Sequence, residues 1–369
     1  MDIVVRRAAI LKPLQAISGI VEKKQTIPIL SNVLLNVQKN TLLLTATDLE
    51  IELIGSVPLE SVATAGSVTV AGRKLFDICR VLPEEAWLRL SLEGNYLVIR
   101  TGETSFSLTT LPVQDFPHVE EASFPVQFSM HPQALKNLLS RIYFAMGLQD
   151  IRHYLNGALL HINQRDITCV ATDGHRLALS SFTSEAADVP QVKIILPRKS
   201  VLELMRLINM GTECETDLTL AVGDGRLRVS TPDFTFTSKL INTQYPDYNK
   251  LIPKGTEVAT GDREAIRQAL MRAAILSNEK FRGVRMRLGQ NKLRVMANNT
   301  EQEQAEEVVS LDYQGHEMEV GFNVTYLLDV FSSIASESVR CTFSDPDGGV
   351  LIEALDDAAS MYVVMPMRL

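Results

Sequence analysis

The feature that most constrains the fold of this 369-residue chain is an internal repeat of about 125 residues. The first copy is clearest in LSNVLLNVQKNTLLLTATDLEIEL from Leu30, which aligns with YLNGALLHINQRDITCVATDGHRLAL from Tyr154. A weaker third copy is FRGVRMRLGQNKLRVMANNTEQEQAE from Phe281. A fixed period of this length indicates repeated domains. We expect three, over residues 1–122, 123–250 and 251–369.

Hydrophobic periodicity predicts the same order of elements in each repeat. A helical segment comes first, two alternating strands follow, and a second helical segment precedes further strands in antiparallel hairpins. The fold class is therefore α+β. The predicted helical segments are 6–21, 71–82, 131–146, 197–208, 262–277 and 322–335.

Composition excludes several classes of protein. Apolar residues make up 46% of the chain, enough for ordinary globular cores, and no apolar run approaches the roughly 20 residues of a spanning helix. We expect a cytoplasmic protein with reduced thiols and without metal or cofactor, because its cysteines and histidines lack metal-ligand spacing and no P-loop occurs.

Charge is distributed unevenly along the chain. The six helical segments carry a net charge of +9, whereas the rest of the chain carries −17, for a total of −8. Solvated helix faces carry either sign, but the bias recurs in five of the six segments. If the helices share a surface, this basic face would attract phosphate without reading sequence.

One pair of residues suggests catalysis. Asp173 and His175 place a carboxylate and an imidazole two residues apart, as an acid–base site in a nucleic-acid-processing enzyme would. The equivalent residues of the first repeat are Asp48 and Glu50, so the histidine is peculiar to the second repeat. A polar turn beside a binding surface therefore explains the pair better, and a non-enzymatic protein is favoured.

Motifs along the whole chain resemble those of bacterial sliding clamps, the β subunits of DNA polymerase III. They include LKPLQ from Leu11, LTATDLE from Leu44, ATDGHRLA from Ala171, AILSNEKFRGVR from Ala274 and the terminal YVVMPMRL. The resemblance implies three clamp domains in a head-to-tail dimeric ring, with the helices lining a hole around double-stranded DNA and antiparallel sheets outside. It also implies a nucleoid-associated processivity factor that binds a clamp-loader complex, the polymerase III α subunit and other clamp-motif proteins.

The same resemblance implies three sets of site residues. For DNA contact they are Lys24, Arg73, Gln149, His153, Tyr154, Arg198 and Lys199, where His153 replaces a common aromatic hydroxyl. For the contact between chains they are Lys74, Phe106, Leu108, Ile275 and Leu276, with Glu301 and Glu303 as nearby acids. For a groove that binds partner peptides they are Leu155, Thr172, Gly174, His175, Arg176, Leu177, Pro246, Lys250, Leu251, Val363, Met365, Pro366, Met367, Arg368 and Leu369.

Two of the groove cations have an expected role. Arg176 and Lys250 stand at the rim in this interpretation, where each would pair with a carboxylate or a polar side chain of the incoming peptide.

Overall fold

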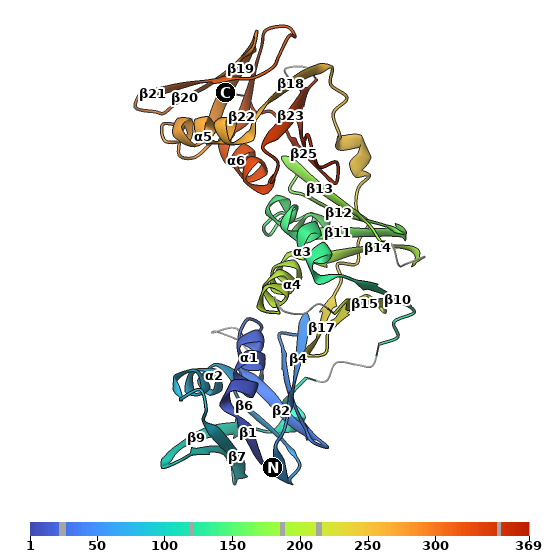
Figure 1. The fold of residues 1–369 in the computed structure, drawn as a ribbon, viewed down its shortest axis with the longest axis vertical. Helices are drawn as coiled ribbons and strands as arrows, with labels where there is room; N and C mark the ends of the chain where they lie inside the picture. The colour runs from blue at the N-terminus through green and yellow to red at the C-terminus, as the bar shows by residue number, and fades with distance from the viewer. Residues whose placement is uncertain (22–26, 118–121, 185–188, 212–215, 345–347, 369) are drawn as a thin grey trace. The chain divides into compact units, whose positions relative to one another are not determined.

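The computed structural model describes residues 1–21, 27–117, 122–184, 189–211, 216–344 and 348–368. Lys24 and Leu369 lie outside the described residues. The described residues contain six α-helices (Figure 1), α1 Arg7–Ile17, α2 Gly72–Val81, α3 Pro132–Ser140, α4 Arg198–Met210, α5 Arg263–Ala274 and α6 Val324–Ser333. Five of them lie within a predicted helical segment, and α4 extends two residues beyond the predicted 197–208, so all six predicted helices are confirmed.

The strands also follow the repeat. The first repeat has β1 Asp2–Arg6, β2 Asn32–Gln38, β3 Thr41–Thr47, β4 Ile51–Pro58, β5 Ser61–Thr64, β6 Ser67–Ala71, β7 Trp87–Glu93, β8 Tyr96–Thr101 and β9 Thr104–Leu111. The second has β10 Val126–Met130, β11 Gly157–Gln164, β12 Asp166–Thr172, β13 Arg176–Thr183, β14 Val189–Pro197, β15 Leu218–Gly223, β16 Arg226–Ser230 and β17 Phe234–Lys239. The third has β18 Glu257–Asp262, β19 Gly283–Gly289, β20 Lys292–Asn298, β21 Gln304–Ser310, β22 Met318–Asn323, β23 Ser338–Phe343, β24 Val350–Ala354 and β25 Ser360–Val364.

The prediction of two strands between the helices of a repeat was incomplete. Four strands, β11 to β14, separate α3 from α4, and the third repeat has four at the same place. Alternation marks only strands with one solvated face. On β13 a run of four buried residues, Leu177 to Ser180, hides the period of two.

The described residues divide into two compact units. The first comprises residues 1–133 and 202–240, and the second comprises 134–201 and 241–369. The first unit contains a 13-stranded sheet in the order β10-β15-β16-β17-β4-β3-β2-β6-β9-β8-β7-β1-β5. The second contains an eight-stranded sheet, β14-β11-β12-β13-β25-β24-β23-β18, and a four-stranded sheet, β21-β20-β19-β22.

Both larger sheets run from one repeat into the next. At the first junction, between the first and second repeats, β4 pairs with β17 over five residue pairs from Phe234–Gly55 to Ser238–Ile51. At the second junction, β13 pairs with β25 over five pairs from Ser360–Ser180 to Val364–Arg176. The two registers are equivalent in the repeat. The internal symmetry of the sequence therefore extends to the contacts between repeats.

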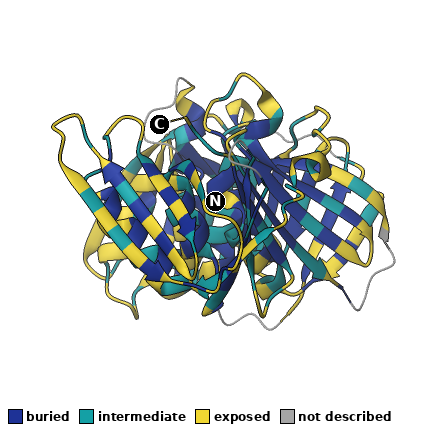
Figure 2. Cartoon of the chain, turned by 90° about the horizontal axis from the view of Figure 1, so that it is seen from above, coloured by how far each residue is buried: buried dark blue, intermediate teal, exposed yellow. Residues whose placement is uncertain are grey.

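The core lies between the helices and the sheets, and many strands alternate between buried and exposed residues (Figure 2). Cys79, Cys169 and Cys341 are free thiols within it, and burial raises the pKa of each to about 12. In the described part of the chain, no helix is long and apolar enough to span a membrane.

Several helix cations have structural partners. Arg7, at the start of α1, donates to the carbonyl oxygens of Cys79 and Arg80 at the end of α2. Arg263, at the start of α5, donates in the same way to the carbonyl oxygens of Phe331, within α6, and Ser336, just beyond it. Such contacts satisfy carbonyls at helix ends. Some of the helix cations therefore stabilise contacts within the chain. A count of charges cannot distinguish these cations from cations that attract a ligand.

Candidate functional site

The predicted groove is built around a turn between β12 and β13. The Asp173 carboxylate accepts hydrogen bonds from the backbone N–H groups of His175 and Arg176, at 2.9 and 3.0 Å. The Thr172 hydroxyl donates to the Arg176 carbonyl oxygen at 2.6 Å. At Gly174 the backbone has a φ of +89°, which favours glycine, and a Cβ there would lie 3.2 Å from the Arg152 guanidinium.

The same turn occurs in the other repeats. Asp48 accepts from the N–H groups of Glu50 and Ile51, and Asn299 accepts from those of Glu301 and Glu303. An asparagine in the same structural role shows that the turn requires a side-chain oxygen but no ionisable group. This geometry removes the main argument for Asp173 as a catalytic acid or base.

A cavity of about 270 Å³ opens beside this turn. Its floor is a buried apolar cluster that includes Leu177 and Val363, and the exposed fractions of Leu251 and Met365 at its mouth are 42% and 41%. Partly exposed apolar side chains over a buried floor suit an apolar ligand. The cavity is lined by Arg152, Tyr154, Leu155, Thr172, Gly174, Arg176, Leu177, Pro246, Leu251, Val363 and Met365.

Arg176 lines the cavity but is held by partners within its own chain. Its side chain is only 10% exposed and forms ion pairs with Asp173 at 3.1 Å and Asp329 at 2.5 Å. It also donates to the Phe144 carbonyl oxygen at 2.6 Å and lies 4.5 Å from the centre of the Tyr326 ring. Arg176 therefore joins the turn to α6 of the third repeat. Its pairing with an incoming peptide stays a prediction, and these partners already use three of its five N–H donors.

Arg152 is the more exposed of the two arginines that line the cavity, and the sequence prediction omitted it. Its side chain is 50% exposed and is held by the Asp150 carboxylate at 2.9 and 3.0 Å. This contact lowers the pKa of Asp150 to about 2. The Asn156 side chain accepts from the Asp150 N–H at 2.8 Å and fixes the same loop. The D-x-R spacing was the available signal for this pair.

The C-terminal segment continues along the cavity. Met365 donates its N–H to the His175 carbonyl oxygen, and Met367 donates to that of Gly321, both at 2.8 Å. Met367 and Arg368 line a neighbouring cavity of about 420 Å³, together with Phe281 and residues of β19 and β20. Side chains of the C-terminal segment therefore line both cavities.

Other predicted groove residues surround the cavity without lining it. The His175 ring stacks on Tyr326 with a centroid distance of 6.0 Å. Lys250 is 82% exposed and lies 3.7 Å from the Asp247 carboxylate. Pro366 is half-buried between the two cavities along the chain.

The first junction carries different side chains at the equivalent positions. Leu49, with a φ of +77°, stands where Gly174 stands. Glu50 and Lys239 form an ion pair at 3.5 Å where the second junction has His175 and Met365. The two junctions therefore share the same backbone turn, but they differ in the side chains at its equivalent positions.

The residues predicted to contact DNA lie in both units. Arg73 is exposed on α2 of the first unit. In the second unit Arg198 donates to the carbonyl oxygens of Tyr143 and Met146, both at 3.1 Å, beneath the loop that carries Gln149 and His153. That loop also exposes Leu148 and Ile151, at 76% and 91%. Lys199 is half-buried on α4. Tyr154 also lines the groove cavity and packs edge-on against Tyr245.

The residues predicted for the chain-to-chain contact lie in the first and third repeats. Phe106 and Leu108 are half-buried on β9. Ile275, which ends α5, is 77% exposed, and Leu276 is half-buried. Lys74 is exposed on α2. Among the described strands, β21 is a terminal strand of its sheet, and β9 pairs with β6 only at Thr110 and Leu111. These are edges to which another strand can add.

Three copies of one α+β repeat, joined by continuous sheets and carrying an apolar groove beside the last strand, define a sliding-clamp subunit. Family models of the DNA polymerase III beta subunit match its N-terminal domain at residues 1–120, its central domain at 129–247 and its C-terminal domain at 249–368. The chain belongs to the family of the DNA polymerase III beta subunit. It is a DNA sliding clamp, a non-catalytic processivity factor of DNA replication.

Individual relatives agree over the full length. The beta sliding clamps of Pseudomonas aeruginosa and Escherichia coli K12 are 46% and 44% identical to this chain, with complete coverage of both sequences. The crystal structure of the Pseudomonas aeruginosa subunit superposes with a TM-score of 0.97 and 46% identity, again over both complete chains. A sliding clamp from Bartonella birtlesii, solved with griselimycin bound, has a TM-score of 0.94 and 33% identity.

Proposed function

We propose that two copies of this chain join head to tail into a ring around double-stranded DNA, and that the groove tethers replication proteins to that ring. The partners are the clamp-loader complex, the polymerase III α subunit and other clamp-motif proteins, working at the nucleoid in the bacterial cytoplasm. The observation that carries this proposal is an open strand edge in the first repeat, on β9, and another in the third repeat, on β21, in a chain whose internal junctions are already paired. The three domains span 1–122, 123–250 and 251–369.

The groove suits a short peptide with large apolar side chains. Leu177 and Val363 supply a rigid floor, while Met365 supplies an adaptable wall. Arg152 and Lys250 remain the exposed cations beside it, each with a carboxylate nearby. A peptide that places leucine or phenylalanine on the floor and a polar side chain toward Arg152 would use both properties.

The contact between chains would place β9 of one copy beside β21 of the other. Phe106 and Leu108 would then be covered, as would Ile275 and Leu276 at the end of α5, which explains apolar side chains on an exposed helix end. Lys74 on α2 would face an acidic edge that includes Glu301 and Glu303. Opposite charges across this contact favour correct association.

Replacing Ile275 and Leu276 together with alanine should convert the dimer into monomers at micromolar concentration. The pair removes apolar area from both contacts of the ring at once, and central apolar residues often contribute about 2 kcal/mol or more to binding. Sedimentation of the variant measures the change, with Val258→Ala, an exposed apolar residue on β18 outside the proposed contact, as the control. A double variant that stays dimeric at nanomolar concentration would show that α5 does not form the contact.

DNA binding in this proposal is topological. Lys24, Arg73, Gln149, His153, Tyr154, Arg198 and Lys199 are the proposed contacts, and phosphate contacts of this kind weaken as salt rises because counterions are released. A closed ring stays on DNA that has no ends even when those contacts are screened.

We therefore expect the protein, once a clamp loader and ATP have placed it on a nicked plasmid, to remain bound at about 0.5 M salt and to leave within minutes after the plasmid is cut. Gel filtration of labelled protein with the plasmid measures retention before and after linearisation. The matched control is the same linear plasmid with both ends blocked by bound protein, which should retain the clamp. Equal loss from circular and cut DNA would rule out encirclement.

A further inference from the structure

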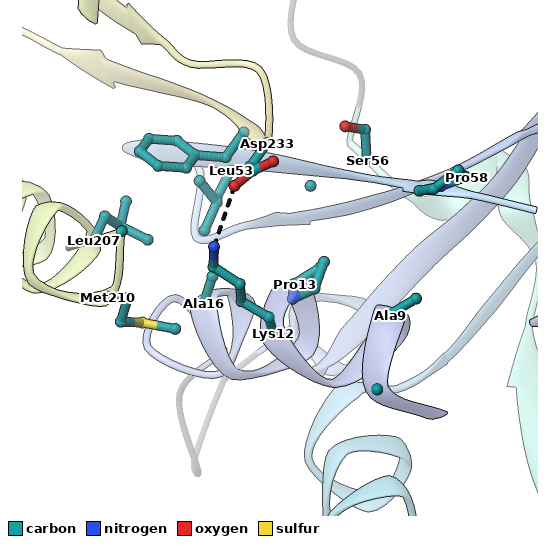
Figure 3. Close-up of a pocket in the computed structure, with 14 residues that line it drawn as sticks. Ala9, Lys12, Pro13, Ala16, Leu53, Ser56, Pro58, Leu207, Met210 and Asp233 are labelled. Atoms are coloured by element: carbon teal, nitrogen blue, oxygen red, sulfur yellow. Dashed lines mark hydrogen bonds and ion pairs between the residues drawn. The ribbon is translucent and has the colours of Figure 1, made fainter. Parts of the chain in front are cut away.

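Both junctions within the chain contain an ion pair between a helix of one repeat and a hairpin turn of the next. At the first junction, Lys12 of α1 reaches the Asp233 carboxylate in the turn before β17 at 3.2 Å (Figure 3). At the second junction, Arg141, just beyond α3, reaches Asp357 in the turn before β25 at 2.6 Å. Each pair lies at the end of the strand pairing that joins the two repeats.

The same elements recur at the free ends of the chain. The hairpin of β8 and β9 corresponds to that of β16 and β17, so that Phe106 takes the place of Phe236 and Thr104 that of Phe234. On the other side, Ala305 of β21 takes the place of Leu53 in β4, since each lies opposite the repeat's conserved alanine, Ala297 or Ala46.

This equivalence specifies a register for the contact between chains. Phe236 pairs with Leu53 at the first junction and Tyr362 pairs with Ala178 at the second. The corresponding pair between two copies is Phe106 with Ala305. Two residues earlier along β9, Thr104 then lies opposite Glu307, and the turn residue Glu103 lies just beyond the paired strands.

A cation stands at that point. Arg272 occupies the position in α5 that Arg141 occupies after α3, six residues beyond the equivalent buried residues Ile266 and Leu135. Within its own chain Arg272 holds Glu307 through two hydrogen bonds of 2.8 and 2.7 Å. Its side chain is 54% exposed, and a guanidinium has five N–H donors, enough for two carboxylates.

We propose that Glu103 of one chain pairs with Arg272 of a second copy, so that Arg272 holds a carboxylate from each chain. The contact between chains would then combine a cation at the position of Arg141 in the second junction with an acid at the position of Asp233 in the first. The inference rests on the proposed dimeric ring. It gives Glu103, which approaches the acidic edge strand β21, a definite cationic partner. Without that cation, Glu103 would face the carboxylate of Glu307.

The symmetry of the ring enlarges the effect of this pair. A head-to-tail dimer of this chain has two identical contacts, so a fivefold weakening of each multiplies the dissociation constant of the ring by about twenty-five. Partly exposed ion pairs of this kind are screened, and the effect should disappear at about 1 M salt, where the Debye length is roughly 3 Å.

The test is a charge exchange on the full-length protein. Sedimentation in low salt would give the dimer dissociation constant for wild type, Glu103→Arg, Arg272→Glu and the double variant. Glu85→Arg, the same charge change at an exposed turn of the first repeat, is the matched control. We expect Glu103→Arg to raise the constant at least tenfold over Glu85→Arg, and the double variant to recover to within about threefold of wild type.

Two results would overturn the pair in different ways. If wild type is a dimer but Glu103→Arg behaves as Glu85→Arg does, or the double variant shows the product of the two single effects, the dimer stands and this ion pair is absent. If wild type is monomeric at every concentration, the dimeric ring itself fails, and the pair fails with it. Circular dichroism of each variant ensures that a change in association is not a change in folding.

Discussion

A chain that ends at Val364 should lose at least a hundredfold in affinity for a clamp-binding peptide while remaining a folded dimer. The deletion of Met365 to Leu369 removes one wall of the groove and the N–H that Met365 donates to His175, but it leaves β25 paired with β13 and β24. Because the apolar floor survives but is no longer enclosed, most of the favourable burial of the peptide is lost. Calorimetry with a peptide from a polymerase subunit measures the loss.

Two point variants separate the contributions of the tail. Met365→Ala removes a side chain that lines the groove cavity, and we expect about a tenfold loss of affinity. Met367→Ala alters the neighbouring cavity instead and should change affinity less than threefold for a short peptide. Unchanged affinity of the truncated chain would show that the peptide binds elsewhere. The reverse order of the two alanine effects would move the site to the second cavity.

Replacing Arg176 with methionine should destabilise the second unit by about 3 kcal/mol, because it leaves the Asp173 and Asp329 carboxylates without their shared cation. For a unit of this size that corresponds to a fall in Tm of roughly 6–12 °C. Peptide affinity should fall as well, since Arg176 positions the turn that carries Gly174 against α6. Thermal unfolding followed by circular dichroism measures the first effect.

Arg141→Met is the matched control for this variant. Arg141 also forms an ion pair across the second junction, but it is 25% exposed where Arg176 is 10% exposed, and it pairs with one carboxylate, that of Asp357, instead of two. Its loss should cost about 1 kcal/mol. Adding Asp329→Asn to Arg176→Met should restore part of the stability, since one unpaired charge is removed. Equal Tm values for the two methionine variants would mean that the Arg176 network contributes nothing beyond a surface ion pair.

The sequence predicts local features of this molecule better than long-range ones. The six helices and the period of the repeat appear directly in the spacing of apolar residues, and the turn at Asp173 repeats in the residues themselves. The pairing of β4 with β17 and of β13 with β25 leaves no such local pattern, because each joins strands that are far apart along the chain. The strand β13 was missed for a different reason, since its run of four buried residues hides the alternation.

Charged residues mark the limit of sequence-based site prediction here. Arg152 and Arg176 are the same residue type and line the same cavity, yet the first is 50% exposed and the second only 10%, because ion pairs within the chain cover it. The difference comes from Asp329, which lies 153 residues away along the chain. A resemblance between sequences transfers the position of such a residue, whereas its role depends on partners that only the folded chain brings together.

The two open edges have a consequence for assembly that the closed ring conceals. β9 and β21 are different surfaces, so one copy's β21 can bind a second copy's β9 and leave a further pair of edges exposed. Contacts of this kind end only when the angle between the two edges of a chain lets the last copy meet the first. A change that alters this angle without weakening either edge would therefore produce not monomers but open filaments, whose length grows with protein concentration.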